Sequence, residues 1–137
     1  MADDVVLNKA ATIERCVARV REEYADDGHG LAVDQRRQDA LVLNLLRACE
    51  TSIDLAMHGV RVRALGAPQS SRDAFAMLVS AEILDRALGD ALQRMVGFRN
   101  IAVHRYQDLD VDVLHAIVRH QLGDLEAFAT AMVRDFS

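Results

Sequence analysis

The chain has 137 residues, of which 51% are hydrophobic and 27% are charged, so it has room for one domain with a buried core and a polar surface. A single Pro, seven Gly and little enrichment in β-branched or aromatic residues favour helices over strands. The net charge of −5 argues against a protein that binds polyanions over its whole surface, and no apolar run approaches the roughly 18 residues that a membrane span needs.

Two long helices are predicted in the first half of the chain. Apolar side chains recur at spacings of three and four over residues 3–26, which is typical of an amphipathic helix. The pattern ends before a loop in which Gly28 and Gly30 can adopt left-handed backbone conformations. The second helix is predicted over residues 34–63, with Asp34 as its N-cap.

A short and a longer helix are predicted next. Residues 66–69 break the chain, and Ser70, three residues before Asp73, predicts the start of a short helix. A longer helical stretch follows from Ile83, with an interruption expected around residues 89–90.

The last helix is predicted to begin after Asp108 or Asp110, each a plausible N-cap, and to carry apolar residues as far as Met132. No repeat or second domain is evident, so residues 1–137 form one domain. The predicted architecture is a compact all-α bundle of four long helices plus one or two short ones, in an up-and-down arrangement with short loops.

The second helix carries a polar stripe opposite its apolar face: Asn44, Arg47, Thr51, Asp54 and His58. Such a stripe is usually a solvated face. In the alternative, part of it lines a cleft, and Arg47, Asp54 and His58 would support the functional residues there. The spacing alone leaves both interpretations open.

Several kinds of site are not expected. Cys16 and Cys49 lie inside helical patterns, which predicts reduced thiols in the core and a cytoplasmic protein, and the acidic N-terminus does not resemble a signal peptide. The chain lacks paired Glu-x-x-His motifs, Cys-x-x-Cys and a P-loop, so no metal or cofactor is expected. His115 and His120 are poor co-ligands, because a spacing of five separates them by roughly 140° on a helix.

The charge distribution singles out one segment. Residues 1–30 hold seven acids and four bases, whereas residues 91–107 hold three arginines and His104 but no acid. Arginine is well suited to pair with phosphate through its planar fork of N–H groups. The basic segment is therefore the candidate for contact with an anionic ligand.

The same segment gathers chemically active side chains at one helix end. Asn100 and His104 are four residues apart and share a helix face, the long side chain of Arg99 can reach around, and Tyr106 follows near the end of the helix. This set suits RNA cleavage without a metal. An imidazole can take the proton of a ribose 2′-OH or deliver one to the leaving 5′-oxygen, and a nearby arginine can stabilise the charge on phosphorus.

The pattern Arg99-x-x-x-x-His104-x-Tyr106 resembles the Arg-x(4–6)-His signature of the HEPN superfamily, and the trailing Tyr resembles its HepT-like toxin branch. The sequence Met-Val-Gly-Phe-Arg-Asn-Ile-Ala-Val-His at residues 95–104 is similar to the sequence usual in that branch. Residues 34–40 and 66–73 are also similar, so the resemblance covers most of the chain.

The resemblance implies a two-fold dimer whose catalytic arginine and histidine line a cleft between protomers that cleaves RNA, as the toxin of a type VII-like toxin–antitoxin pair. It further implies a minimal nucleotidyltransferase partner, encoded alongside, that neutralises the toxin by transferring AMP to Tyr106. On this basis Arg99 and His104 are the catalytic residues, and Asn100 is expected to support them by hydrogen bonding. Candidate contacts to the cleft or to RNA are Arg94, Arg105, Arg47 and Asp54. At the position of Arg105, the resemblance leads us to expect an acidic residue in many relatives.

Three alternatives remain at this point. The motif could be an ordinary helix C-terminus, where His104 and Arg105 complement the helix dipole and Tyr106 packs its ring. The chain could be a non-catalytic helical module that docks a nucleotidyltransferase or binds a nucleotide, which its overall acidity favours. It could also be a plain helical dimerisation domain.

Overall fold

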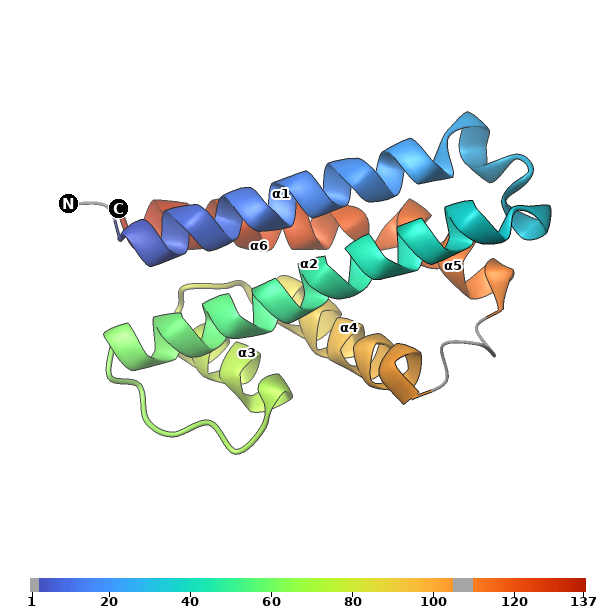
Figure 1. Cartoon of the computed structure of the whole chain (residues 1–137). Coiled ribbons are helices and arrows are strands. Elements are labelled where there is room, and N and C mark those ends of the chain that lie inside the picture. Colours follow the sequence, from blue (N-terminus) through green and yellow to red (C-terminus); the bar gives the residue numbers. More distant parts are fainter. Residues whose placement is uncertain (1–2, 105–109) are drawn as a thin grey trace.

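The computed structural model describes residues 3–104 and 110–137, with only the backbone of His104, and the helices of these ranges form a bundle (Figure 1). The four longer helices are α1 (Asp4–Tyr24), α2 (Gln35–Val62), α4 (Arg86–His104) and α6 (Leu122–Asp135), and the two shorter ones are α3 (Ser71–Ser80) and α5 (Val111–His120). No strand occurs in the described ranges. The predicted all-α bundle of four long helices and one or two short ones is therefore confirmed.

Polar side chains at the predicted positions start the helices. Asp34 and Ser70 accept hydrogen bonds from backbone N–H groups in the first turns of α2 and α3, both at 3.1 Å. Asp3 does the same for α1. Of the two caps predicted for the last helical region, Asp110 accepts from the first turn of α5 at 2.9 Å, and Asp108 lies outside the described residues.

Buried side chains from all six helices form one core, in which α2 packs against α1 and α3, and α6 lies along α1 (Figure 1). Each helix buries the apolar stripe that its spacing predicts. The largest fully buried side chains include Ile13, Leu45, Leu55, Phe75, Leu92 and Phe128. The two ends of the chain meet, since the backbone N–H of Asp3 donates to the carbonyl of Phe136 at 3.2 Å.

The α1–α2 loop contains two short 3₁₀ turns, Asp26–Gly28 and Leu31–Val33. Gly28 and Gly30 both have φ of +78°, so the left-handed conformations expected of them are confirmed. Gly28 is also pressed against α5, because a Cβ atom there would lie 2.4 Å from Cε1 of His115.

The interruption expected around residues 89–90 is wrong, because α4 runs unbroken from Arg86 through Gly89. Gly89 serves close packing instead. A Cβ atom at this position would lie 2.2 Å from Cγ2 of Val79, so the missing side chain lets α3 lie against the first turns of α4.

The prediction of a single last helix is also wrong, because the region contains two helices, α5 and α6, that meet at Gln121. This residue has φ of −120° and ψ of −17°. The break lets each part pack on its own neighbours: α6 lies along α1, whereas α5 contacts the end of α1 through His115. The apolar spacing continues across the break and therefore does not reveal it.

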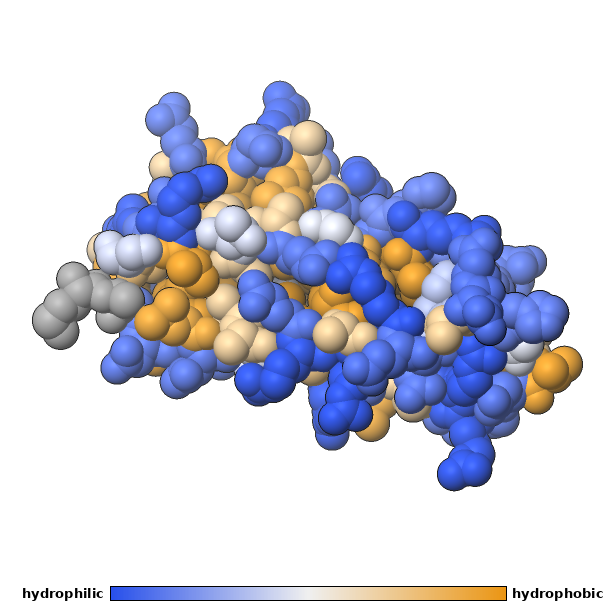
Figure 2. Space-filling view, turned by 90° about the horizontal axis from the view of Figure 1, so that it is seen from above, coloured by the Kyte–Doolittle hydropathy of each residue, from blue (hydrophilic) through white to orange (hydrophobic). Residues whose placement is uncertain are grey.

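The surface above α1 is shown in Figure 2, where polar side chains cover most of the face and an apolar area lies near the end that carries the N-terminus. Val5 and Leu7 are exposed apolar residues of this part of α1. Among the described residues, no helix combines the length and the apolar character needed to cross a bilayer.

Candidate active site

Three helices converge on Arg99, the arginine of the predicted motif. Its Nη1 atom lies 3.3 Å from Oε1 of Glu50 on α2, and its Nη2 atom donates to Oγ of Ser71, the first residue of α3, at 3.4 Å. The Nε atom is buried and has no hydrogen-bond partner. The guanidinium is thus held at its two terminal nitrogens, while 22% of the side chain stays exposed.

The charge of Arg99 acts on the core residue beside it. Cys49 is buried next to Glu50, and burial raises the pKa of its thiol to about 12, with a further increase from the Glu50 carboxylate and an opposing decrease from Arg99. Both Cys49 and Cys16 are buried and unpaired, as predicted. Neither thiol is therefore available as a nucleophile in the folded chain.

The second residue of the motif, His104, is the last residue of α4. Its backbone lies five residues beyond Arg99, about 7.5 Å along the helix axis and roughly 140° around it. Asn100 is exposed and precedes His104 by one turn. Arg105 and Tyr106 lie outside the described residues, so their arrangement around His104 remains a prediction.

A largely apolar groove runs between α3, α4 and α5, with a volume of about 500 Å³. Arg94 and Arg72 stand beside it, and both are exposed. The side chain of Arg72 lies across Gly97, where a Cβ atom would come within 2.7 Å of its Nη2 atom. Ile101 lines the groove toward the C-terminal end of α4.

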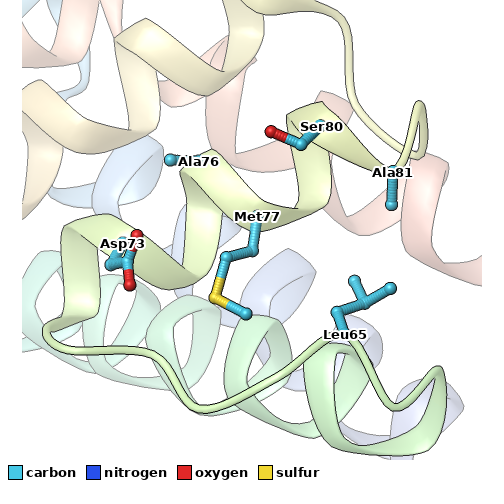
Figure 3. A pocket seen from close by; sticks show the side chains of 6 residues that line it. All are labelled: Leu65, Asp73, Ala76, Met77, Ser80 and Ala81. Carbon is cyan, nitrogen blue, oxygen red and sulfur yellow. The ribbon is translucent and has the colours of Figure 1, made fainter.

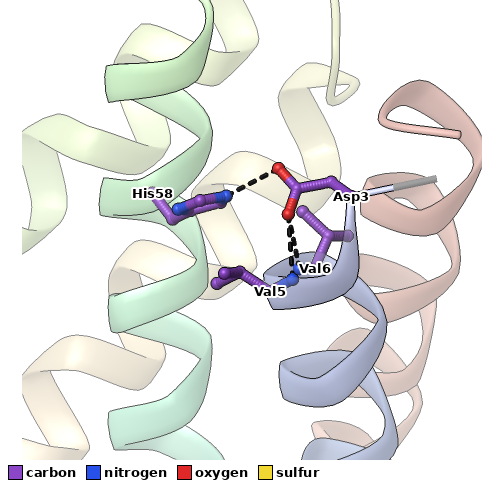
Figure 4. Close-up of polar contacts among 4 residues, drawn as sticks. All are labelled: Asp3, Val5, Val6 and His58. Carbon is purple, nitrogen blue, oxygen red and sulfur yellow. Dashed lines mark hydrogen bonds and ion pairs between the residues drawn. The ribbon is translucent and has the colours of Figure 1, made fainter. Parts of the chain in front are cut away.

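The polar stripe of α2 splits between two environments. Arg47 and Asp54 are exposed, and neither forms a hydrogen bond or ion pair within the described residues. His58 faces the start of α1, where its Nε2 atom lies 2.7 Å from Oδ2 of Asp3 (Figure 4). His58 thus supports the N-cap of α1, and its ring is not among the partners of Arg99.

Glu50 was not predicted from the sequence, although a signal for it exists. It lies three residues after Arg47 and four before Asp54, so it shares their helix face. The face that was expected either to be solvated or to line a cleft therefore contacts the arginine of the motif.

A second hollow, beside α3, has no comparable chemistry. It measures about 300 Å³ and is lined by Leu65, Asp73, Ala76, Met77, Ser80 and Ala81, with the Met77 side chain lying between α3 and the preceding loop (Figure 3). Its one carboxylate, that of Asp73, accepts a hydrogen bond from the backbone of Gln69. Over residues 3–104 and 110–137, no group of three or more His, Cys, Asp or Glu side chains could hold a metal ion.

The all-α fold and the arginine held on α4 are those of a helical domain with a basic site, consistent with the HEPN-type resemblance of its motif, and comparison with known proteins specifies it further. The family model "Ribonuclease HepT-like" matches residues 13–132. The chain is 46% identical to the mRNA nuclease HepT of Shewanella oneidensis over 126 residues, which cover 92% of this chain and 94% of that protein. The chain therefore belongs to the HepT-like ribonuclease family, which confirms the predicted resemblance and the enzyme class.

Solved structures are similar over nearly the whole chain. A toxin–antitoxin complex with AMP-PNP contains a chain of 44% identity and a TM-score of 0.89, with 95% of this chain and 98% of that chain covered. A tri-AMPylated HEPN toxin of Shewanella oneidensis, in complex with its MNT antitoxin, is 45% identical with a TM-score of 0.89, covering 95% and 97%. These similarities confirm the HEPN-like fold.

Proposed function

We propose that this chain is a metal-independent endoribonuclease toxin that acts as a homodimer in the cytoplasm, as one half of a type VII-like toxin–antitoxin pair. Its partner is a minimal nucleotidyltransferase that neutralises it by transferring AMP to Tyr106. One observation carries the proposal: the motif arginine, Arg99, is held by two neighbouring helices in a chain that is 46% identical to a named mRNA nuclease.

The proposed reaction divides between His104 and Arg99. His104 removes the proton from a ribose 2′-OH, whose oxygen then attacks the adjacent phosphorus. The P–O5′ bond breaks, which leaves a 2′,3′-cyclic phosphate and a 5′-oxygen that takes up a proton. Arg99 stabilises the additional negative charge on the phosphoryl oxygens, and Asn100 supports the site by hydrogen bonding. Arg94, Arg47 and Asp54 are candidates for contact with the RNA, as is Arg105.

A homodimer would provide the second proton-transfer group. One imidazole cannot easily serve as base and acid in the same turnover, whereas a two-fold axis brings two copies of each residue together. Exposed apolar side chains support such an interface close to the motif: Ile101 is 57% exposed, Val103 54% and Val113 44%. Ile101 on α4 and Val113 on α5 line the groove described above, and Val103 is the residue before His104 on α4.

AMP transfer to Tyr106 would block this site by charge and bulk. The similar toxin from Shewanella oneidensis is tri-AMPylated in its complex with the MNT antitoxin. Each AMP unit adds a phosphodiester charge of about −1 and an adenosine two residues from His104. Both would oppose entry of an RNA phosphate.

Cleavage of mixed cellular RNA in excess EDTA tests the proposal, with wild type, His104→Ala and Arg99→Ala compared after intact mass has shown that Tyr106 is free of AMP. We expect cleavage by the wild type and a loss of at least about 100-fold in each variant. Undiminished cleavage by His104→Ala would overturn the catalytic assignment. No cleavage by unmodified wild type would favour the binding-module alternative, in which the chain docks the nucleotidyltransferase without cutting RNA.

A further inference from the structure

We infer that Glu50 is a positioning residue for the reaction: its carboxylate, on α2, fixes the orientation in which the Arg99 guanidinium on α4 meets the scissile phosphate. This inference rests on the proposed function, because it assigns Glu50 a role through Arg99. The sequence motif, which spans residues 99–106, does not include Glu50.

The contacts of Arg99 make Glu50 its principal restraint. The ion pair at 3.3 Å joins Nη1 to a full negative charge, whereas the bond from Nη2 to the Ser71 hydroxyl is neutral and long at 3.4 Å. Nε has no partner that could fix the plane of the group. Without Glu50, one long hydrogen bond would remain to hold a side chain with several rotatable bonds.

The restraint leaves donors free for a substrate. Nη1 and Nη2 each carry two N–H groups, and each nitrogen has one protein partner among the described residues. The remaining N–H groups form the fork that can bind two oxygens of one phosphate. A guanidinium that is already held by Glu50 and Ser71 loses less conformational freedom when phosphate binds. Its free N–H groups also stay at the position where charge develops in the transition state.

A purely structural role explains Glu50 poorly. Its side chain is 48% exposed, and ion pairs of such exposure add little to stability. A carboxylate beside Arg99 also repels an RNA phosphate, so it weakens binding of the anionic substrate. Better orientation of the Arg99 guanidinium offsets this weaker RNA binding only if it increases the rate of the chemical step.

The inference therefore predicts a change in kcat without an increase in KM. We expect Glu50→Ala and Glu50→Gln to lower kcat roughly 10- to 100-fold, while KM stays equal or falls because a negative charge is removed. Glu50→Asp keeps the charge but moves it by one methylene, and we expect an intermediate kcat. Glu14→Gln is the matched control, since it removes the same charge from an exposed position on α1.

A double-substitution cycle separates positioning from an independent role. If Glu50 acts through Arg99, Glu50→Ala should have no further effect on the residual single-turnover rate of Arg99→Ala. Thermal unfolding of the Glu50 variants should remain close to that of wild type, because the Glu50 side chain is 48% exposed. The chain is assayed after intact mass has shown it to be free of AMP.

Each outcome separates this inference from the proposed function. Wild-type kcat in Glu50→Ala, beside an inactive His104→Ala, would overturn the role of Glu50 alone. An increase in KM at constant kcat in Glu50→Ala would assign Glu50 to RNA binding. An increase in kcat in Glu50→Ala would show that the ion pair inhibits the action of Arg99. Additive losses of rate in the double-substitution cycle would show that Glu50 acts independently of Arg99. Wild-type cleavage by His104→Ala would instead overturn the proposed function, whatever the effect at Glu50.

Discussion

The hydroxyl group of Tyr24 lies 2.7 Å from Nδ1 of His115, and this hydrogen bond joins the end of α1 to the middle of α5. The two rings also meet edge to face, with centroids 5.3 Å apart and an interplanar angle of 73°. Gly28 packs against both rings, where no side chain would fit. The contact fixes α5, which contributes one wall of the groove beside the motif helix.

Removing the Tyr24 hydroxyl should therefore destabilise the fold. Tyr24→Phe retains the ring contact but leaves the His115 nitrogen without its partner, and we expect a loss of about 1 kcal/mol in the free energy of unfolding. Urea unfolding followed by circular dichroism measures the change. An unchanged unfolding midpoint would mean that water replaces the hydroxyl at no cost.

Most helix starts and loop conformations were predictable, because residues close in the sequence determine them. Asp34 and Ser70 cap helices at the points where a polar residue precedes an apolar stripe, and Gly28 and Gly30 take the left-handed conformations that few other residues adopt. The break at Gln121 lacked such a signal, since it depends on how α5 and α6 pack against α1.

The site was predictable only in part, for a related reason. Arg99 and His104 lie five residues apart in a recognisable pattern, whereas the partners of Arg99 come from positions 49 and 28 residues away. Glu50 and Ser71 reach it only because α2, α3 and α4 converge. A spacing pattern within one helix carries no information about such contacts.

Gly89 should be intolerant of any side chain, although it lies inside a helix where alanine is normally preferred. Gly89→Ala gains up to about 1 kcal/mol in helix propensity, but its Cβ atom would lie 2.2 Å from Cγ2 of the stiff Val79 side chain. We expect a net loss of about 1–3 kcal/mol, as for other overpacked sites.

Gly123 provides the matched control for Gly89 in a urea unfolding experiment. It is exposed in α6, and a Cβ atom there would have no neighbour within 4 Å. Gly123→Ala should therefore be neutral or stabilising. Equal effects of the two substitutions would contradict the packing explanation.

The cysteines should resist modification until the chain unfolds. With a pKa of about 12, roughly 10⁻⁴ of the Cys49 thiol is ionised near pH 8, and both Cys49 and Cys16 are buried. A chromogenic disulfide reagent should thus release almost no colour from the native chain and two equivalents in denaturant. Rapid reaction of one thiol in the native chain would show that the region around Cys49 and Arg99 opens readily.

The Asp3–His58 contact should make the fold more sensitive to acid. A hydrogen bond from His58 is the main cause that lowers the pKa of Asp3 from its ordinary value of 3.8, and the N–H groups of Val6 and Val5 lower it further (Figure 4). Because the pKa is lower in the folded state, the contribution to stability is present above the ordinary pKa and is lost as the pH falls below it.

Asp3→Asn keeps an N-cap oxygen but removes this titration. We expect its thermal midpoint to lie below that of wild type near pH 7 and the two midpoints to converge below about pH 4. Asp4→Asn removes the same charge from the exposed neighbouring residue and should cause a smaller loss at neutral pH. A constant difference between wild type and Asp3→Asn at every pH would assign the effect to packing rather than to the charge of Asp3.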